Sequence, residues 1–237
     1  MRVSRLCRVT LLTSLATTVL SSCASSAIVA ESVTWTFAEF PRIAHHRAQV
    51  LGSPRALLVD GRHALCFDGR SDGVIVATNP IARWSQFTIE VLIKPDGTGD
   101  EEQRFLHIED GRSSRVLLET RVTPNGRWAL DTFMYVSDSE NRVLLDRDKQ
   151  HAADRWQWVA LSFDGRTMAH HVNGTTELDG PVAFHPMTEG RISLGVRLNE
   201  QYWYKGCIAE VRFTPRALPR SMLARISSAT NTESAGQ

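Results

Sequence analysis

Six side chains combine a charge or an aromatic ring with a position inside or beside an otherwise apolar segment: Glu119, Asp131, His171, Arg197, Tyr202 and Trp203. Planar charged groups hydrogen-bond to hydroxyls, and aromatic rings pack on apolar C–H faces. Sugars present both kinds of surface, so we interpret these six residues as candidate ligand-binding side chains. The alternative is that the charged residues lie on a solvated face and the rings in the core.

Three of these candidates lie close together in the sequence. Arg197 and Trp203 flank a short polar connection, residues 198–201, whose composition is typical of a turn. The two ends of a hairpin would bring a planar cation and an aromatic ring to one rim. We expect Arg197, Tyr202 and Trp203 to form one edge of the ligand surface, and replacement of Trp203 to leave the melting temperature almost unchanged.

The histidines and cysteines do not have the spacing of a metal centre. The pairs His45-His46 and His170-His171 are adjacent, and neighbours on a strand point to opposite faces, so neither pair can hold one ion. A Cys-x-x-Cys pair is absent from the sequence, which argues against structural zinc. We therefore assign no metal ligand, no cofactor and no catalytic residue.

Short β-strands must position the candidate residues. Nine of the 15 glycines directly follow Asp or Asn, which is typical of tight turns. Between these turns, segments rich in β-branched and aromatic residues predict strands at 87–94, 115–122, 128–135, 156–163, 167–172, 192–197 and 208–213. Asp164-Gly165 predicts a two-residue hairpin turn between two of them. Many short antiparallel strands indicate an all-β sandwich or barrel.

The C-terminal segment is expected to differ from the rest of the chain. Residues 219–226 predict a short helix, capped by Ser221, in which Met222, Leu223 and Ile226 pack inward. Residues 227–237 are polar and without periodicity, which indicates a disordered tail.

The N-terminus has the pattern of an export signal. Arg2, Arg5 and Arg8 precede an apolar stretch that is too short to span a bilayer comfortably. The stretch ends in Leu-Ser-Ser-Cys, which resembles a bacterial lipobox, with cleavage before Cys23 and lipidation of its thiol. We expect a signal peptide at 1–22, a lipidated tether at 23–33 and a membrane-anchored protein of the cell envelope. The alternative is ordinary cleavage after residue 27 or 30, giving a periplasmic or secreted protein.

The charge balance excludes one class of partner. The chain has 27 basic and 26 acidic side chains, and removal of residues 1–22 leaves 24 and 26. A near-neutral chain lacks the field that holds nucleic acid by releasing counterions. We expect no nucleic-acid partner, membrane contact only through the N-terminal lipid, and a monomer.

Two cysteines remain in the folded part, Cys66 and Cys207. Export favours a disulfide between them. However, Cys207 is in phase with Val211 and Phe213, whereas Cys66 alternates with Leu65, so simple alternation would place the two on opposite faces. Both alternatives, a disulfide and two separate thiols, stay open.

Three ordered groups of segments resemble the laminin-G-like domains of the concanavalin A-like lectin/glucanase superfamily. The first comprises 64–69 with its Asp68-Gly69, 72–76 and 87–95; the second comprises 156–165 and 171–174; the third comprises 204–213 and 216–218. The resemblance implies a jelly-roll sandwich of two curved antiparallel sheets over residues 34–218, followed by the short helix. It also implies that Tyr204 is a buried aromatic residue.

The resemblance often implies carbohydrate recognition, and we expect a noncatalytic module that binds a glycan or another extracellular polymer. It also allows a structural Ca²⁺, but Ala209 stands where relatives carry an Asp ligand, so the site would depend on Asp68, Asp72 and carbonyl groups. The glucanase arrangement of alternating acids on one strand is absent from the sequence. The alternatives are a glycoside hydrolase or lyase on the same scaffold, and an adhesion module that binds protein.

Overall fold

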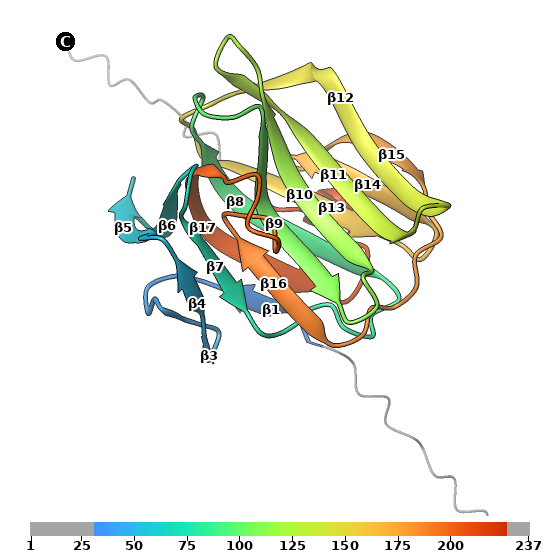
Figure 1. Cartoon of the computed structure of the whole chain (residues 1–237). Coiled ribbons are helices and arrows are strands. Elements are labelled where there is room, and N and C mark those ends of the chain that lie inside the picture. Colours follow the sequence, from blue (N-terminus) through green and yellow to red (C-terminus); the bar gives the residue numbers. More distant parts are fainter. Residues whose placement is uncertain (1–30, 227–237) are drawn as a thin grey trace, which may run out of the picture.

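The computed structural model describes residues 31–226, which form two antiparallel β-sheets packed face to face (Figure 1). The eight-stranded sheet has the order β15 (Thr175–Pro181), β14 (Thr167–Val172), β13 (Gln157–Phe163), β8 (Phe87–Pro95), β17 (Lys205–Thr214), β6 (Arg62–Asp68) and β5 (Arg55–Val59), with β1 (Val33–Trp35) paired to β17. The seven-stranded sheet has the order β12 (Glu140–Ala152), β11 (Arg127–Ser137), β10 (Arg115–Val122), β9 (Glu102–Asp110), β16 (Gly190–Leu194), β7 (Gly73–Val76) and β4 (Gln49–Leu51). A small hairpin joins β2 (Arg42–Ile43) to β3 (His46–Arg47).

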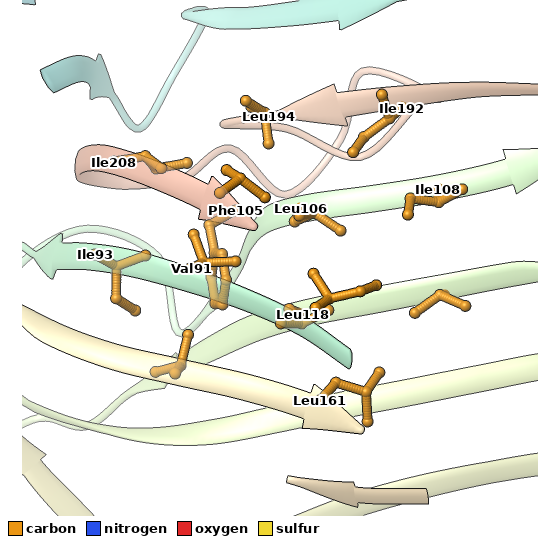
Figure 2. Packing of buried hydrophobic residues seen from close by; sticks show 14 of the residues in the cluster. Val91, Ile93, Phe105, Leu106, Ile108, Leu118, Leu161, Ile192, Leu194 and Ile208 are labelled. Atoms are coloured by element: carbon orange, nitrogen blue, oxygen red, sulfur yellow. The ribbon is translucent and has the colours of Figure 1, made fainter. Parts of the chain in front are cut away.

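The core lies between the two sheets and is built by alternate residues of their strands. On β8, the side chains of Val91 and Ile93 are fully buried and face Leu118 of β10 across the sandwich (Figure 2). Full burial of one such side chain contributes about 1.5–3 kcal/mol. The packing fixes which face of each strand points inward, and it therefore also fixes which side chains are left for the outer faces.

The structure confirms the all-β sandwich and places a strand in each of the seven expected segments. The strand expected over 192–197 ends at Leu194, so Arg197 lies in the loop beyond it. Two long strands, β9 and β12, are additional to those expected. The β13–β14 hairpin turns one residue later than expected, because Asp164 N donates to Thr167 O (3.2 Å) around Gly165 and Arg166.

The short C-terminal helix expected over 219–226 is present only as a single turn. The segment makes one turn of 3-10 helix at Arg220–Met222, and the backbone is extended again at Leu223. Ser221 lies inside this turn and caps nothing. The chain instead docks on the outer face of the eight-stranded sheet, where Ala224 N donates to the buried Glu90 Oε1 (2.7 Å). Tertiary contacts, rather than local helix formation, set this conformation.

Cys66 and Cys207 form a disulfide that links β6 to β17. The two residues are direct partners in the antiparallel register, with their Cα atoms 4.0 Å apart, so they share one face. The expectation of opposite faces fails because β17 has a register shift between Ile208 and Glu210. The additional residue there, Ala209, reverses the alternation between the two halves of the strand.

Several expectations concern residues outside the described range 31–226. These are the signal peptide at 1–22, the lipidation of Cys23 and the disordered tail at 227–237. Within the described residues, no helix combines the length and the apolar character needed to cross a membrane.

Candidate binding site

Three neighbouring strands present polar side chains on the outer face of the seven-stranded sheet. On β10, Val116 and Leu118 belong to the core, so the residues between them alternate outward. The same alternation on β11 leaves Asp131, Phe133 and Tyr135 facing outward, because Leu130 and Met134 are in the core. These outward side chains meet over the middle of the sheet.

They line a pocket of about 250 Å³ that we call the outer-face pocket. Its wall consists of side chains from β9, β10, β11 and β12 and from the loop that follows β16: Arg104, Arg115, Leu117, Glu119, Arg121, Asp131, Phe133, Val143 and Arg197. The lining therefore includes four arginines and two carboxylates, together with an apolar patch.

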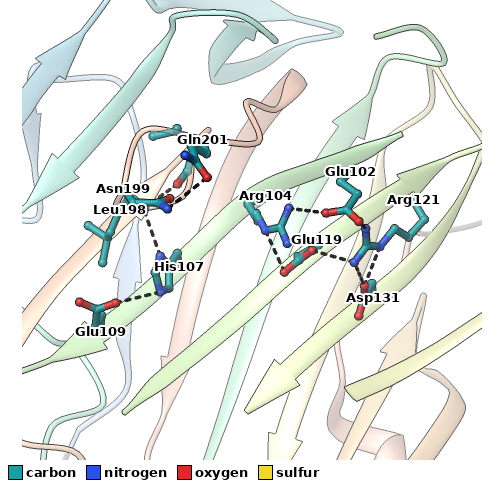
Figure 3. A network of polar contacts seen from close by, with 12 residues as sticks. Glu102, Arg104, His107, Glu109, Glu119, Arg121, Asp131, Leu198, Asn199 and Gln201 are labelled. Atoms are coloured by element: carbon teal, nitrogen blue, oxygen red, sulfur yellow. Dashed lines mark hydrogen bonds and ion pairs between the residues drawn. The ribbon is translucent and has the colours of Figure 1, made fainter. Parts of the chain in front are cut away.

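One end of the pocket holds a network of ion pairs between strands (Figure 3). Arg121 donates from Nε and Nη2 to Asp131 Oδ2 (2.7 and 2.6 Å), and its Nη2 lies 3.4 Å from Glu119 Oε2. Arg104 Nε lies 3.1 Å from Glu119 Oε1, and its Nη1 donates to Glu102 Oε2 (2.9 Å). Arg121 Nη1 also pairs with Glu102. The register explains the proximity, since Glu119 is opposite both Arg104 and Asp131.

Two of the three carboxylates of this network are removed from water. The side chains of Glu119 and Asp131 are 3% and 2% exposed. Burial raises the pKa of Glu119 to about 7, although Arg104 and Arg121 favour its charged form. Burial also raises the pKa of Asp131 above its ordinary value. Glu119 can therefore exchange a proton near neutral pH, which is unusual for a carboxyl group.

The other end of the pocket holds an arginine with no carboxylate partner among the described residues. Arg115 lies opposite Tyr135 in the β10–β11 register, and its guanidinium carbon is 3.7 Å from the centre of that ring. A second ring, Phe133, lies 5.8 Å away. Arg115 Nε is buried and has no hydrogen-bond partner within residues 31–226. The contact with the Tyr135 ring thus holds this guanidinium in place, while its Nε stays without a partner among the described residues.

The loop after β16 covers the same face and adds two candidate residues. Arg197 lines the pocket, and the turn that follows it is closed by Glu200 N donating to Arg197 O (2.8 Å). Tyr202 O accepts from Arg104 N (2.9 Å), and the Tyr202 ring centre lies 3.6 Å from the Arg104 guanidinium carbon. Tyr202 has a φ of +62°, a strained conformation for an aromatic residue. This strained conformation places the half-exposed Tyr202 ring on Arg104 of the ion-pair network.

Trp203 occupies a different position from the one expected. It is half-buried and does not line the pocket. Its ring packs over Gly73 of β7, where a Cβ atom would come within 3.4 Å of Trp203 Cζ3. Tyr204, the next residue, is fully buried, in agreement with the resemblance. Trp203 therefore packs its loop against β7 and is not part of the pocket wall.

His107 is a buried histidine beside the pocket that the sequence did not assign to the site. Leu198 N donates to His107 Nδ1 (3.0 Å), and His107 Nε2 lies 3.7 Å from Glu109 Oε2 (Figure 3). Burial and the charges of Arg197, Arg115, Arg104 and Arg191 lower the pKa of His107 to about 3. The ring is neutral at pH 7, and it fixes the start of the 198–201 turn.

His171 does not belong with the other candidates, which corrects the expectation. It lies on β14 in the eight-stranded sheet, where Met168 and Val172 face the core and His171 faces the opposite side. Its ring hydrogen-bonds to Ser162 Oγ (3.0 Å) and Thr176 Oγ1 (2.9 Å). Burial, together with the charge of Arg220, lowers its pKa to about 4. His171 is therefore a structural residue of the other sheet.

The structure brings four of the six candidates to one place: Glu119, Asp131, Arg197 and Tyr202. Arg115 shares a strand face with Glu119, and Phe133 shares one with Asp131, because each pair is an even number of residues apart. This spacing could have indicated Arg115 and Phe133 as further pocket residues. Arg104 and Glu102 had no such signal, because β9 was not expected to be a strand.

Asp68, one of the residues considered for calcium, is engaged in hydrogen bonds within its own loop. Asp68 Oδ1 accepts backbone N–H groups of Arg70 (2.8 Å), Ser71 (2.9 Å) and Asp72 (3.0 Å). Burial alone would raise the pKa of Asp68, but these hydrogen bonds lower it to about 2. Across residues 31–226, no group of three or more His, Cys, Asp or Glu side chains is placed to hold a metal ion.

Comparison with known protein families identifies the fold. Residues 68–224, more than half of the chain, match the laminin G family model described as concanavalin A-like lectin/glucanases superfamily. The chain belongs to this superfamily. A comparison with proteins of curated function finds no match.

Solved structures of the superfamily's fold resemble the chain at low sequence identity. Domain 4 of AbnA, a GH43 extracellular arabinanase from Geobacillus stearothermophilus in complex with arabinotriose, is 18% identical, with a TM-score of 0.55 over 75% of this chain and 86% of that domain. The ligand-binding domain of botulinum neurotoxin serotype D in complex with N-acetylneuraminic acid is 12% identical, with a TM-score of 0.60 over 79% of this chain. The chain spans about half the length of that domain (48%). A heptameric SAP-like pentraxin from Limulus polyphemus is 16% identical, with a TM-score of 0.54 over 66% and 77% of the two chains.

Proposed function

We propose that this protein is a noncatalytic module that binds a glycan, or a similar extracellular polymer, in the outer-face pocket. The observation that carries the proposal is the combination of aromatic rings with buried polar atoms that have no partner. Asp131 Oδ1 and Arg115 Nε are both buried without a hydrogen-bond partner among residues 31–226. Leaving such groups unpaired is unfavourable, so a ligand that supplies hydroxyl and acceptor groups would be stabilised there.

The aromatic residues supply the second half of sugar recognition. Phe133 lines the pocket, and the partly exposed Tyr202 ring lies over Arg104, another residue of the pocket wall. Sugar C–H faces pack on such rings while their hydroxyls reach the polar groups between them. Two structural neighbours, the arabinanase domain and the neurotoxin domain, are in complex with arabinotriose and N-acetylneuraminic acid, which agrees with this proposal.

The proposal includes a location. The N-terminal sequence supports export, with a lipid on Cys23 as the only contact with the membrane. A monomeric module tethered in this way would hold an envelope or extracellular polymer close to the cell surface, and it has no nucleic-acid partner.

Binding to an array of polysaccharides, followed by titration of the strongest ligand, tests the proposal. Phe133→Ala should weaken binding about tenfold, because an aromatic anchor contributes about 1–3 kcal/mol. Trp156→Ala is the matched control, since Trp156 is a partly buried aromatic residue on the outer face of the other sheet. The proposal fails if no glycan binds, or if the two variants weaken binding equally.

One observation favours a second function, a polysaccharide-active enzyme. Glu119 and Asp131 are directly opposite on neighbouring strands, and burial raises both pKa values, that of Glu119 to about 7. A pair of carboxyl groups with one protonated near neutral pH is what general acid catalysis of glycoside cleavage requires. Reducing-end and unsaturated-uronate assays on the bound polysaccharide test it. Turnover that is lost in Glu119→Gln would establish the enzyme, whereas binding without turnover supports the module.

A further inference from the structure

We propose that the outer-face pocket selects an acidic glycan, and that Arg115 and Arg197 bind the carboxylate or sulfate group of one of its sugars. This inference rests on the proposed function and adds the chemical class of the ligand. It is carried by the uneven distribution of charge within the pocket.

The two ends of the pocket differ in their charge balance. Arg104 and Arg121 are matched by three carboxylates, those of Glu102, Glu119 and Asp131, within 3.4 Å or less. In this network the two arginines pair only with these three carboxylates, so carboxylates outnumber arginines. At the other end, among residues 31–226, Glu109 is opposite Arg115 in the β9–β10 register, but its ion-pair contact within 4.0 Å is with His107 Nε2 (3.7 Å) and not with an arginine.

Arg115 and Arg197 carry the unbalanced positive charge. Among residues 31–226, neither guanidinium has a carboxylate within 4.0 Å, although both line the pocket. Arg115 is four residues from Glu119 along β10, roughly 13 Å at the rise of a β-strand, so the acids of the network do not neutralise it. Both cations are therefore free to pair with an anion supplied by a ligand.

The charges that act on His107 agree with this positive end. His107 pairs with Leu117 of the pocket wall in the β9–β10 register. After burial, the strongest influence that lowers its pKa is the charge of Arg197, followed by that of Arg115. Glu109, at 3.7 Å from His107 Nε2, is the nearby acid, and it does not reverse the effect. The two arginines thus act on one region of the sheet.

Geometry and chemistry together indicate an acidic sugar rather than a simple anion. A guanidinium held with its carbon 3.7 Å from the centre of the Tyr135 ring offers N–H groups to a planar carboxylate, which can accept two hydrogen bonds at once. At the other end, Asp131 Oδ1 is a buried acceptor without a donor within the described residues, and it suits a hydroxyl group. A ligand that satisfies both ends carries hydroxyls and an anionic group on one ring or on neighbouring rings.

The experiment compares each acidic polymer with its neutral counterpart, using the mature protein. The probes are polygalacturonate, hyaluronan and polysialic acid, each with its carboxyl-reduced form, and dextran sulfate with dextran. The inference predicts that at least one acidic member binds about tenfold or more tightly than its neutral partner, and that added salt weakens this binding. A preference within the carboxylate pairs identifies a carboxylate ligand, and one confined to dextran sulfate identifies a sulfate ligand.

Substitutions assign the effect to the two arginines. Arg115→Gln and Arg197→Gln should each reduce the preference for the acidic form about tenfold while leaving the circular dichroism spectrum unchanged. Arg166→Gln, which removes the same charge from an exposed turn of the other sheet, should retain the preference. Equal binding of acidic and neutral forms, or wild-type preference in both pocket variants, overturns this inference and leaves glycan binding intact. Failure to bind any polysaccharide overturns the proposed function as well.

Discussion

Replacing Glu119 by Gln should change how the stability of the protein depends on pH. Glu119 is buried among Arg104, Arg121, Glu102 and Asp131, and burial holds its pKa at about 7. A carboxyl group whose pKa is raised by folding binds its proton more tightly in the folded protein than in the unfolded chain. Its contribution to stability is therefore complete below the unfolded pKa of 4.5 and is lost as the pH rises through 7.

The size of the effect follows from the two pKa values. Each pKa unit corresponds to about 1.4 kcal/mol, so raising the pKa of Glu119 from 4.5 to about 7 corresponds to about 3 kcal/mol. Most of this loss, about 2.5 kcal/mol, falls between about pH 5 and about pH 8. Gln has the same shape and does not ionise, so the loss is absent from Glu119→Gln. The free energy of unfolding of the wild type should fall relative to that of the variant over this range.

Urea unfolding at several pH values measures this difference. Burial lowers the pKa values of His107, His170 and His171, and these histidines stabilise the fold as the pH rises. Their contribution cancels because wild type and variant share it. Glu189→Gln, at an exposed ion pair, is the control and should show no pH-dependent difference from the wild type. A difference between the wild type and Glu119→Gln that stays constant with pH would refute the reasoning.

Three further predictions concern the rim of the pocket, the disulfide and the anchor. Tyr202→Ala should weaken glycan binding about tenfold with little change in melting temperature, because Tyr202 is 38% exposed. His171→Ala should leave binding unchanged, and a loss of binding in this variant would show that His171 belongs to the site. Replacing Cys66 and Cys207 by Ser should lower the free energy of unfolding by about 2–5 kcal/mol in urea titrations, since the bond closes a sequence separation of 141 residues; an unchanged midpoint would contradict this. Cys23→Ser should move the protein from the membrane fraction to the soluble fraction; a variant that stays with the membrane would disprove lipidation.

Strands with one buried and one polar face were predictable from the sequence, and strands without that pattern were not. Segment 87–94 alternates cleanly and forms β8 as expected. On β9, the register shifts beside Phe105, and the adjacent residues Phe105 and Leu106 both belong to the core, so the alternation is broken. On β12, an edge strand, only Leu144 is buried, and no apolar face was available to indicate the strand.

The candidate site was predictable in its residue types and not in its assembly. Glu119 and Asp131 were identified because each is a polar residue within an apolar strand. Their direct pairing, and the ion pairs through Arg121, depend on which strands are neighbours, which is a long-range property of the sandwich. His171 met the same criterion as Glu119, but β14 belongs to the other sheet. The type of a residue alone could not assign it to a sheet.

The most direct test of glycan binding in the outer-face pocket is a crystal structure of the protein with the oligosaccharide that binds best in the titrations. The account predicts that the sugar lies across β9, β10 and β11, between Arg115 and the Tyr202 ring, with a hydroxyl near Asp131 Oδ1. A sugar bound on the outer face of the eight-stranded sheet, or on loops remote from these strands, would contradict it.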